Sequence, residues 1–398
     1  MKNNKVDINS KNSPVELNIS KKNILVVFTD PHLCYSPSTL NLYDSLNDYF
    51  NVSIITFTPE ENYSAQKLLN HKVEYLAYGN WLPEKGVPLI TRLLNELKKT
   101  LFGIKINKEA DPLLTGKANV LIERIKVFNG IIIAVDFFAM WCVQKAGKSA
   151  HLFSLEIIEN DPYRTACDLS AIQSVAIQTL DRYEYLFGKR EIKTYLIQNA
   201  PKFIKQEIDY SKRKNTNLIF CGSAMPEFGV FTCIEFLLDY PEYTLTVKGA
   251  IPPLVRSNIL EKFDFLLKEN RLILDETYLN PDCLNNFLSG YYIGFVFYDA
   301  FRFAKVNSFN YITAPSGKLF QYYNAGIPVI VSNIKGLNSV KELGTGIMIN
   351  ALNSSSIKNA ITEIEANYLQ FAMAAKKASI QFDFSRSVEP YISFLQEQ

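Results

Sequence analysis

The feature of this sequence that most constrains its fold is a series of short, continuous apolar runs. The first occupies residues 23–29, Asn-Ile-Leu-Val-Val-Phe-Thr, and lies between Lys22 and Asp30-Pro31. A run of this length without polar alternation is typical of a strand buried on both faces of a parallel sheet. Similar runs recur along the chain, with segments of helical periodicity between them. This alternation predicts a doubly wound α/β architecture.

The apolar runs form two series. The first series comprises residues 23–29, 52–57, 73–77, 130–135, 150–155, 175–180 and 194–197. The second comprises residues 217–221, 243–247, 272–274, 293–298 and 328–332. Between them lie an Asn-Ala-Pro sequence and the polar run Ser-Lys-Arg-Lys-Asn-Thr, which are typical of a linker. We therefore predict a first Rossmann-like domain over residues 22–200, a linker over residues 201–216 and a second Rossmann-like domain over residues 217–384. Helices are predicted over residues 316–324 and 357–381.

Composition excludes some classes of function. The 398 residues include 42 Lys and Arg against 40 Asp and Glu, a formal net charge of +2. Binding to nucleic acid through counterion release requires clustered cations, so this balance argues against a nucleic-acid-binding protein. The six cysteines are scattered without a C-x-x-C pair, and the three histidines lie far apart. We therefore expect reduced cysteines and no metal site.

Residues 1–21 are polar and lack the apolar centre of a secretory signal, so we expect a disordered lead-in and a cytoplasmic protein. No apolar stretch is long enough to span a bilayer. Residues 89–108 place leucines and isoleucines at helical spacing beside arginine and lysines. Such a basic amphipathic helix could dock on anionic lipid at the inner membrane face. The alternative is a core-facing stripe with a solvated opposite side.

The segment of residues 313–330 combines a loop, a helix start, a glycine and a buried strand. It reads Thr-Ala-Pro-Ser-Gly-Lys-Leu-Phe-Gln-Tyr-Tyr-Asn-Ala-Gly-Ile-Pro-Val-Ile. Ser316 and Gly317 can offer free backbone N–H groups at the helix N-terminus, where the helix dipole favours anions. Lys318 opposes that dipole but suits a bound diphosphate. The alternative for Lys318 is a solvated side chain on an ordinary helix.

This segment resembles the donor-site motif of the group 1 (family 4-like) glycosyl transferases, of the form P-S/N-K-L-F-E-Y-x-A-x-G-x-P-V-I. The matching positions are Pro315, Ser316, Lys318, Leu319, Phe320, Tyr322, Ala325, Gly326, Pro328, Val329 and Ile330. The resemblance implies the GT-B fold, in which two Rossmann-like domains face a central cleft. It also implies that the nucleotide-sugar donor binds the second domain. The last helix, within residues 385–398, is then expected to cross back to the first domain.

Flanking segments extend the resemblance and add donor-site candidates. Residues 218–223 resemble the strand and glycine turn beneath the donor phosphates, which adds Gly222 and Ser223. Where many family members carry Arg and Lys against the diphosphate, this chain has Ser223 and Phe228. The candidates for replacement cations are Arg302, Lys305, Lys318 and Lys248, with Arg302 and Lys318 favoured by position.

Two glutamates often stand eight residues apart in the family, the second against the donor ribose. This chain has Thr313 and Gln321 at those positions. Gln321 can still hydrogen-bond a ribose hydroxyl, but without charge assistance. The predicted donor contacts are therefore Gly222, Ser223, Arg302, Lys305, Ser316, Gly317, Lys318, Leu319 and Gln321.

The resemblance implies a hexosyltransferase-type enzyme that moves a sugar from a UDP- or GDP-sugar to a hydroxyl of a glycan or lipid-linked glycan, with retention of configuration. The enzyme is expected to act in the assembly of surface polysaccharide or glycoconjugate. No D-x-D pair occurs in the sequence, which favours a metal-independent site without a cofactor. If the enzyme instead inverts, it needs a general base on the first domain. Glu156 is the first candidate, followed by His32 and Asp136, each at the end of a predicted strand.

Each candidate base also has a structural alternative. Glu156 can be a capping or surface carboxylate, His32 a solvated loop residue, and Asp136 a helix cap. Two other functions share the fold. One is a nucleotide-sugar epimerase, which needs no acceptor, and the other is a non-catalytic partner subunit, motivated by Ser223, Phe228 and Gln321. A dehydrogenase is disfavoured because no G-x-G-x-x-G follows the first apolar run.

Overall fold

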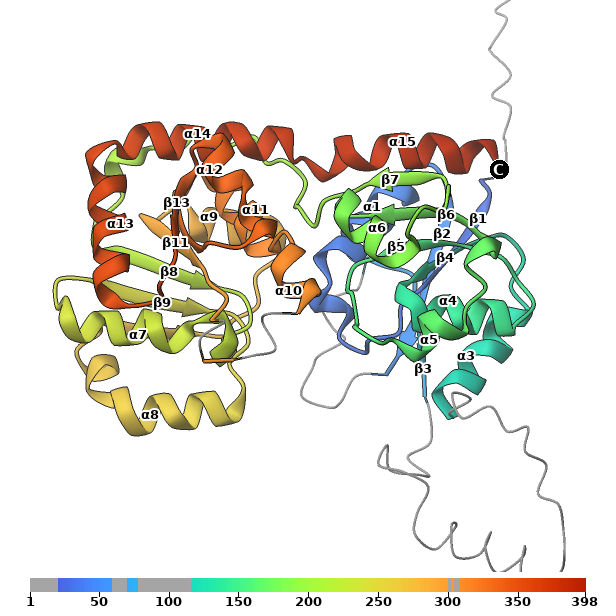
Figure 1. The fold of residues 1–398 in the computed structure, drawn as a ribbon, viewed down its shortest axis with the longest axis horizontal. Helices are drawn as coiled ribbons and strands as arrows, with labels where there is room; N and C mark the ends of the chain where they lie inside the picture. The colour runs from blue at the N-terminus through green and yellow to red at the C-terminus, as the bar shows by residue number, and fades with distance from the viewer. Residues whose placement is uncertain (1–20, 59–69, 78–115, 300–301, 304–307) are drawn as a thin grey trace, which may run out of the picture.

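The computed structural model of the chain describes residues 21–58, 70–77, 116–299, 302–303 and 308–398. The described residues form two α/β domains side by side, each built on a parallel sheet with helices on its faces (Figure 1). The predicted architecture of two successive Rossmann-like domains is therefore confirmed. The amphipathic segment of residues 89–108 lies outside the described residues. Across the described part, no helix has the length and apolar character that a bilayer span needs.

Within the described residues, the first sheet has seven parallel strands in the order β3-β2-β1-β4-β5-β6-β7. The strands are β1 (Asn23–Val27), β2 (Asn51–Phe57), β3 (Val73–Leu76), β4 (Ile131–Val135), β5 (Ala150–Ser154), β6 (Ile172–Ile177) and β7 (Thr194–Leu196). The sheet has a hydrophobic core on each face. Successive β1 residues alternate between them: Ile24 packs into the core on one face and Leu25 into the core on the other. This burial on both faces explains the continuous apolar runs.

Helices and short 3₁₀ turns connect these strands. They are η1 (Leu33–Tyr35), α1 (Pro37–Asn47), α3 (Gly116–Lys126), α4 (Asp136–Lys145), α5 (Pro162–Ala166), η3 (Leu169–Ala171) and α6 (Leu180–Phe187). The strand order reverses direction between β1 and β4, so the switch point of this sheet lies at their carboxyl ends.

The second sheet has six parallel strands among the described residues, in the order β10-β9-β8-β11-β12-β13. They are β8 (Asn217–Cys221), β9 (Thr244–Lys248), β10 (Leu272–Asp275), β11 (Ile293–Val296), β12 (Val329–Ser332) and β13 (Gly346–Ile349). Its switch point lies between β8 and β11. Strand β13 is missing from the sequence prediction, in which its residues, Gly-Ile-Met-Ile, were not identified as an apolar run.

The helical elements of the second domain follow the same alternation. They are η4 (Tyr210–Lys212), η5 (Pro226–Phe228), α7 (Val230–Asp239), α8 (Pro253–Lys268), α9 (Pro281–Leu288), α10 (Phe309–Thr313), α11 (Gly317–Asn324), η7 (Lys335–Leu337), α12 (Ser339–Leu343), α13 (Ser354–Ala366) and α14 (Tyr368–Gln381). The single helix predicted over residues 357–381 is wrong, because the chain breaks at Asn367 with φ −138° and ψ 36°. The break lets Tyr368 stack on Tyr292, with ring centroids 3.9 Å apart.

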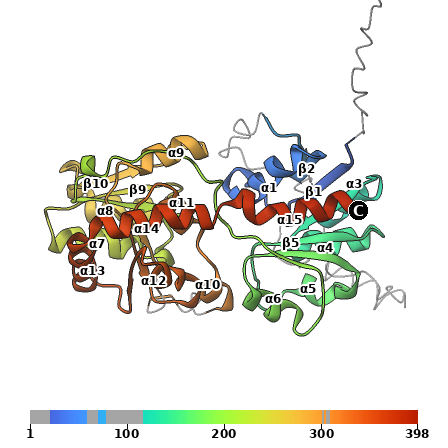
Figure 2. The ribbon, with the colours of Figure 1, turned by 90° about the horizontal axis from the view of Figure 1, so that it is seen from above.

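The last helix, α15 (Phe384–Glu397), crosses back to the first domain as expected. Helices α14 and α15 follow one another along the molecule and span both domains (Figure 2). The buried face of α15 includes Val388, Tyr391 and Leu395, which join the same core cluster as Ile24 of β1. Asp383 lies where the chain crosses between the domains. Its carboxylate accepts hydrogen bonds from the N–H groups of Ser385 and Phe203, each at 3.0 Å.

The polar run of residues 211–216 contains one buried arginine. Arg213 is 7% exposed and donates to the carbonyls of Ala325 at 2.5 Å, Gly326 at 2.6 Å and Ser289 at 2.8 Å. These contacts satisfy the carbonyl groups that follow α11 (Ala325 and Gly326) and α9 (Ser289), which lie at the ends of these helices. The predicted linker is thus anchored to the second domain rather than solvated throughout.

The substitution Arg213→Ala is expected to lower the free energy of unfolding by about 3 kcal/mol, because it leaves several buried carbonyls without a charged donor. Lys212→Ala is the matched control, since the Lys212 side chain is 82% exposed. Chemical denaturation of both variants checks this difference. Equal stabilities of the two variants would contradict the anchoring role of Arg213.

Candidate functional site

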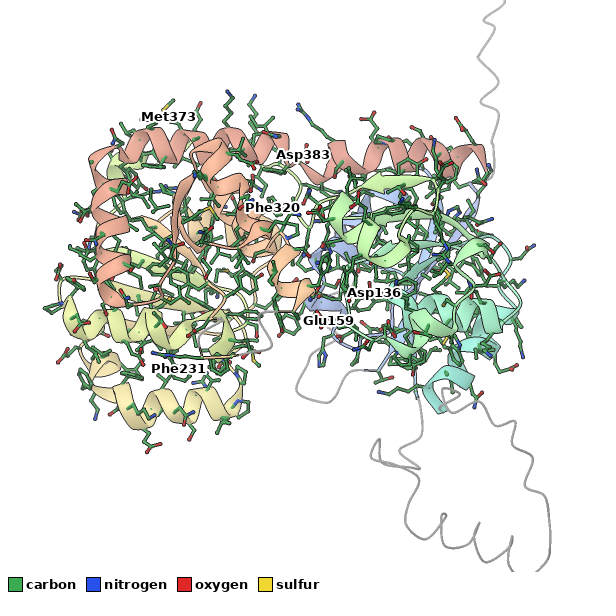
Figure 3. The ribbon with its side chains drawn as sticks, in the orientation of Figure 1. Asp136, Glu159, Phe231, Phe320, Met373 and Asp383 are labelled. Carbon is green, nitrogen blue, oxygen red and sulfur yellow. The ribbon has the colours of Figure 1, made fainter. Side chains whose placement is uncertain are left out.

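The carboxyl-end side of the first sheet contacts α10 of the second domain. Glu159, in the loop after β5, accepts a hydrogen bond of 2.6 Å from the N–H of Phe309. Tyr185 of α6 stacks on the Phe309 ring, with centroids 4.1 Å apart. Figure 3 shows Asp136 and Glu159 on the side of the first domain that faces the second. Doubly wound sheets bind ligands outside these strand ends, so the candidate site lies here.

Arg182 of α6 joins the two domains. Its side chain is fully buried, and Nη2 donates to the carbonyl of Leu155 at 2.8 Å and to Oδ1 of Asn310 at 2.9 Å. Nη1 lies 3.4 Å from the carbonyl of Asn310 and 3.5 Å from Oγ1 of Thr313. The guanidinium therefore fixes the end of β5 against the helix that precedes the predicted donor loop.

Asp136 lies directly after β4 in a conformation that is rare for a non-glycine residue. Its φ is 62°, and Oδ1 accepts the N–H groups of Leu155 at 2.7 Å and Glu156 at 3.2 Å. Burial, together with the nearby Glu156 carboxylate, raises the pKa of Asp136 to about 7. Left-handed backbone at a non-glycine residue and a raised carboxyl pKa are both typical of functional sites.

Glu156 is exposed but engaged across the domain interface. Its Oε2 accepts a hydrogen bond of 2.8 Å from Nδ2 of Asn310. Oδ1 of the same asparagine accepts the N–H of Ile157 at 3.0 Å in addition to the Arg182 contact. Asn310 therefore orients both Glu156 and Arg182. The structure brings Asp136 and Glu156 together at the ends of the neighbouring strands β4 and β5.

His32, the third predicted base, follows the carboxyl end of β1. Its Nδ1 lies 3.0 Å from Oδ1 of Asp30, which also accepts the His32 N–H at 2.7 Å. Because β1 and β4 are neighbours in the sheet, His32 shares its edge with Asp136. Its hydrogen bonds within the loop suit a structural role of this histidine in shaping the turn.

The glycine turn after β8 forms one side of the predicted donor site. Gly222 has φ 110°, a conformation that favours glycine, and its N–H donates to the carbonyl of Lys248 at 2.7 Å. A Cβ atom on Gly222 would lie 3.0 Å from Cε of Lys318, so the glycine also allows the lysine to pass closely. Ser223 follows the turn and is exposed.

The start of α11 lies beside this turn. Ser316 is the N-cap residue, and its side chain makes no capping hydrogen bond to the helix. A Cβ atom on Gly317 would lie 3.3 Å from Nδ2 of Asn199, at the exit from the first domain. Leu319 is fully buried in the domain core, so its side chain serves packing rather than ligand contact. Gln321 accepts a weak hydrogen bond of 3.8 Å from the Cys221 thiol.

Two of the candidate cations are already paired with acidic residues. Lys248 is buried and lies 2.8 Å from Asp275. Arg302, which the sequence favoured, donates to Glu235 at 3.0 Å and approaches Asp299 at 3.6 Å. A diphosphate would have to displace these carboxylates or accept their repulsion. Lys305 lies outside the described residues.

Lys318 differs from these cations. Its Nζ lies 4.4 Å from the ring centroid of Phe220 and 4.6 Å from that of Phe228. Among the described residues, no carboxylate forms an ion pair with it. Burial lowers the pKa of Lys318 to about 8, so the ammonium and the neutral amine are both accessible near neutral pH.

Sequence reasoning did not identify Arg182, Asn310 or Tyr298 as site residues. Asn310 lies outside any motif. Its role depends on contacts across the domain interface with Arg182 and Glu156, which are more than a hundred positions away in the sequence. Tyr298, at the end of β11, carried no signal beyond its position after an apolar run.

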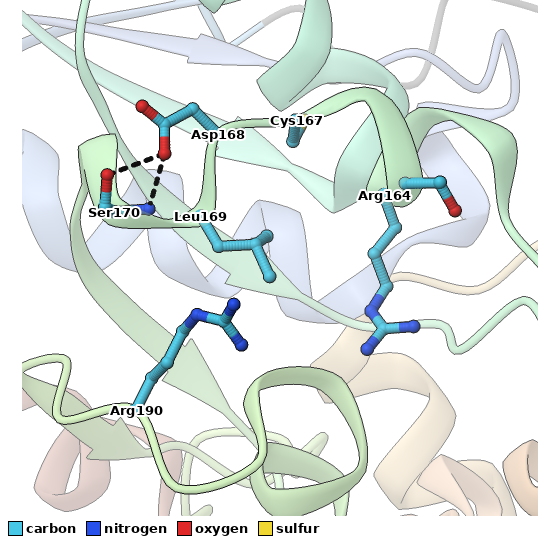
Figure 4. A pocket seen from close by; sticks show the side chains of 7 residues that line it. Arg164, Cys167, Asp168, Leu169, Ser170 and Arg190 are labelled. Atoms are coloured by element: carbon cyan, nitrogen blue, oxygen red, sulfur yellow. Dashed lines mark hydrogen bonds between the residues drawn. The ribbon is translucent and has the colours of Figure 1, made fainter.

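A cavity of about 450 Å³ lies elsewhere on the first domain (Figure 4). Its lining includes Arg164 and Arg190, but these donate to the carbonyls of Leu186 at 2.6 Å and Phe187 at 3.2 Å, at the end of α6. It also includes η3, which precedes β6 and so lies at the amino end of the sheet. The cavity is therefore opposite the edge where such folds bind ligands, and its arginines cap a helix.

In the described residues, no group of three or more His, Cys, Asp or Glu side chains is arranged to hold a metal ion. The groups that remain for binding an anion at this interface are the Gly222 turn, the start of α11 and Lys318. The groups that remain for handling a proton are Asp136 and Glu156. The arrangement can therefore hold a diphosphate on one domain and orient a hydroxyl group from the other.

No family model matches the sequence, and neither does any curated protein sequence. Solved structures do match. HepE from Anabaena, in complex with UDP and glucose, is 14% identical with a TM-score of 0.67, covering 95% of this chain and 100% of that chain. The pneumococcal O-GlcNAc transferase GtfA, in complex with UDP and GlcNAc, is 15% identical with a TM-score of 0.53, covering 71% of this chain and 60% of that chain.

A third similar structure is a Listeria monocytogenes protein assigned as a UDP-N-acetylglucosamine 2-epimerase. It is 14% identical with a TM-score of 0.55, covering 95% of this chain and 98% of that chain. At these identities the similarity establishes the fold alone. The chain has the GT-B fold, as the sequence predicted.

Proposed function

We propose that this chain is a glycosyltransferase that moves a sugar from a nucleotide-sugar donor to a hydroxyl of a glycan or lipid-linked glycan. The transfer proceeds without a metal ion, in the assembly of surface polysaccharide or glycoconjugate. The first-domain base assigned below goes with inversion of configuration, instead of the retention that the family resemblance implies. The donor binds the second domain, and the acceptor binds the first. UDP is preferred as the donor nucleotide because the HepE and GtfA structures hold UDP in the same fold.

The observation that carries this proposal is the position of Lys318. Its side chain crosses the Gly222 turn at the switch point between β8 and β11, and α11 begins one residue before it. Backbone N–H groups at a helix start and a lysine without an acidic partner among the described residues form a suitable environment for a leaving diphosphate. The negative charge that develops on the diphosphate during transfer is then stabilised without a metal.

Asp136 and Glu156 support the acceptor side of the proposal. Both lie at the carboxyl end of the first sheet, where α10 of the donor domain contacts it. Asp136 accepts two backbone N–H groups with Oδ1, and its pKa of about 7 lets it exchange a proton near neutral pH. We assign Asp136 to accept the proton of the acceptor hydroxyl and Glu156 to orient that hydroxyl.

The test is calorimetric binding of UDP and GDP to the wild type and to Lys318→Ala, with a chelator present. We expect wild type to bind UDP and the variant to bind it about 10–100-fold more weakly, since a charge-assisted contact is lost. Lys335→Ala is the control, because this exposed lysine pairs with Asp181 instead. Equal binding by wild type and Lys318→Ala would contradict the donor site proposed here.

The similarity to the Listeria protein favours a second candidate, a nucleotide-sugar epimerase. The two activities differ in their need for an acceptor. Incubation of the protein with UDP-sugars alone, followed by NMR, would reveal an isomerised sugar in the case of an epimerase. A glycosyltransferase would leave the sugar unchanged until an acceptor is added. If neither UDP nor GDP binds, the protein is better described as a non-catalytic partner subunit.

A further inference from the structure

Lys318 is held by two aromatic rings from different elements. Phe220 belongs to the buried strand β8, and Phe228 ends the short turn η5 that follows the Gly222 loop. We call these two residues the aromatic cage. A lysine ammonium within about 6 Å of an aromatic ring centroid is attracted to the ring face, and both distances, 4.4 Å and 4.6 Å, meet this criterion.

Phe228 is itself fixed by further aromatic residues. Its ring meets that of Tyr298 edge-on at 5.6 Å and 86°, and that of Tyr311 at 6.0 Å and 66°. Tyr298 is in turn fixed by its backbone N–H, which donates to Oγ of Ser332 at 2.8 Å. These aromatic contacts restrict the Phe228 ring to its position beside Lys318.

An aromatic cage holds a cation without using its hydrogen-bonding capacity. A lysine ammonium has three N–H donors, and the faces of two phenyl rings accept none of them strongly. The groups that face Lys318 from the adjoining elements are the thiols of Cys221 on β8 and Cys233 on α7. Burial raises the pKa of Cys221 to about 11 and that of Cys233 further, so both are neutral at pH 8. An arriving diphosphate therefore meets an ammonium that need not be separated from a carboxylate.

We propose that Phe228 is a positioning residue, which holds the Lys318 ammonium against the Gly222 turn for the donor diphosphate in place of a second cation. This inference rests on the proposed donor site. It explains why a chain with Ser223 and Phe228, instead of two basic residues, can still bind a diphosphate. One lysine side chain held in a fixed position takes the place of two flexible basic side chains. A side chain that is already positioned loses less conformational freedom when the diphosphate binds.

The test compares UDP binding between pH 7 and pH 9.5 in wild type, Phe228→Leu and Phe228→Tyr. Wild type should lose affinity above a pH of about 8, as the lysine loses its proton. Phe228→Leu keeps the apolar surroundings but removes the ring face, which favours the protonated amine. We expect about 10-fold weaker UDP binding at pH 7.5 and a loss of affinity that begins at lower pH. Phe228→Tyr should restore the wild-type profile.

The matched control is Phe231→Leu, the same change on α7, where the ring packs against the domain core. A second measurement follows the Lys318 side chain directly by NMR titration, using lysine labelled at Cε, and reports its pKa without nucleotide. We expect Phe228→Leu to lower this pKa and Phe231→Leu to leave it unchanged.

The outcomes separate the cage from the proposed function. If wild type binds UDP but Phe228→Leu has the same affinity, pH profile and Lys318 pKa, the positioning role is overturned and the donor site stands. If wild type binds neither UDP nor GDP, the proposed function is overturned, and with it the role of the cage in donor binding. Weaker binding by Phe228→Leu with an unchanged pH profile and pKa would also overturn the proposal, because it would indicate a purely structural effect.

Discussion

Replacing Asp136 with asparagine is expected to reduce sugar transfer by a factor of about 10²–10⁴, the usual contribution of a general base. Asparagine tolerates the left-handed conformation at φ 62°, and its side-chain oxygen can still accept the N–H of Leu155. The backbone should therefore stay in place while proton acceptance is lost. Steady-state kinetics with a UDP-sugar and an acceptor measure the effect.

The pH dependence of the wild-type reaction follows from the same residue. Because the pKa of Asp136 is raised to about 7, the carboxyl group is protonated below this pH and unable to accept a proton. We expect kcat/KM to rise with pH up to about 7 and to fall again above a pH of about 8, where Lys318 loses its proton. The profile of Asp136→Asn should lose this rise. Glu156→Gln is the control, since Glu156 is exposed and should retain the rise at a lower overall rate.

The pH dependence of the free energy of unfolding distinguishes a catalytic role of Asp136 from a structural one. A carboxyl group whose pKa is raised on folding stabilises the protein below its unfolded pKa, and this contribution is lost as the pH rises through about 7. Above pH 7 the buried charge therefore opposes folding. Asp136→Asn should be at least as stable as wild type at pH 8 while being far less active. A variant that is both inactive and unstable at pH 8 would contradict this assignment.

Replacing Arg182 with alanine is expected to lower the free energy of unfolding by about 3–5 kcal/mol, the range found when one partner of a buried charged network is removed. The arginine is fully buried, and its loss removes the charged donor from the carbonyl of Leu155 and from Oδ1 of Asn310, which keep only neutral donors. Since these contacts join the two domains, calorimetry should also show thermal transitions of the domains that are further apart than in wild type.

Arg190→Ala is the matched control for this prediction. Arg190 follows the same helix, is exposed and donates to one carbonyl, that of Phe187. Its removal should change the stability by no more than about 0.5 kcal/mol. Arg182→Lys should recover only part of the loss, because an ammonium cannot reproduce the forked geometry of a guanidinium. A wild-type calorimetric profile for Arg182→Ala would refute a role in joining the domains.

The local pattern of the sequence was sufficient for the fold. Buried parallel strands require apolar residues on both faces, so the runs around Ile24 and Ile219 identified their strands without knowledge of the partner strands. The last helix was expected within residues 385–398 from the family resemblance, and α15 packs Val388, Tyr391 and Leu395 into the core of the first domain. Boundaries were less well determined: β6 begins at Ile172 rather than residue 175, and Asn367 interrupts the helix predicted across it. Such limits depend on caps and tertiary contacts rather than on periodicity.

The candidate site was likewise predicted only in part from the sequence. The family resemblance in the sequence predicted that Gly222, Ser316, Gly317 and Lys318 belong to one donor site, and in the structure the Lys318 side chain does lie against the Gly222 turn. The tertiary structure decided which cations are engaged: Arg302 meets Glu235 sixty-seven positions away, whereas Lys318 rests between two phenylalanine rings. It also decided that Arg182 and Asn310 meet. Charge pairing and burial depend on contacts between distant segments, and these contacts exist only once both domains have folded and packed together.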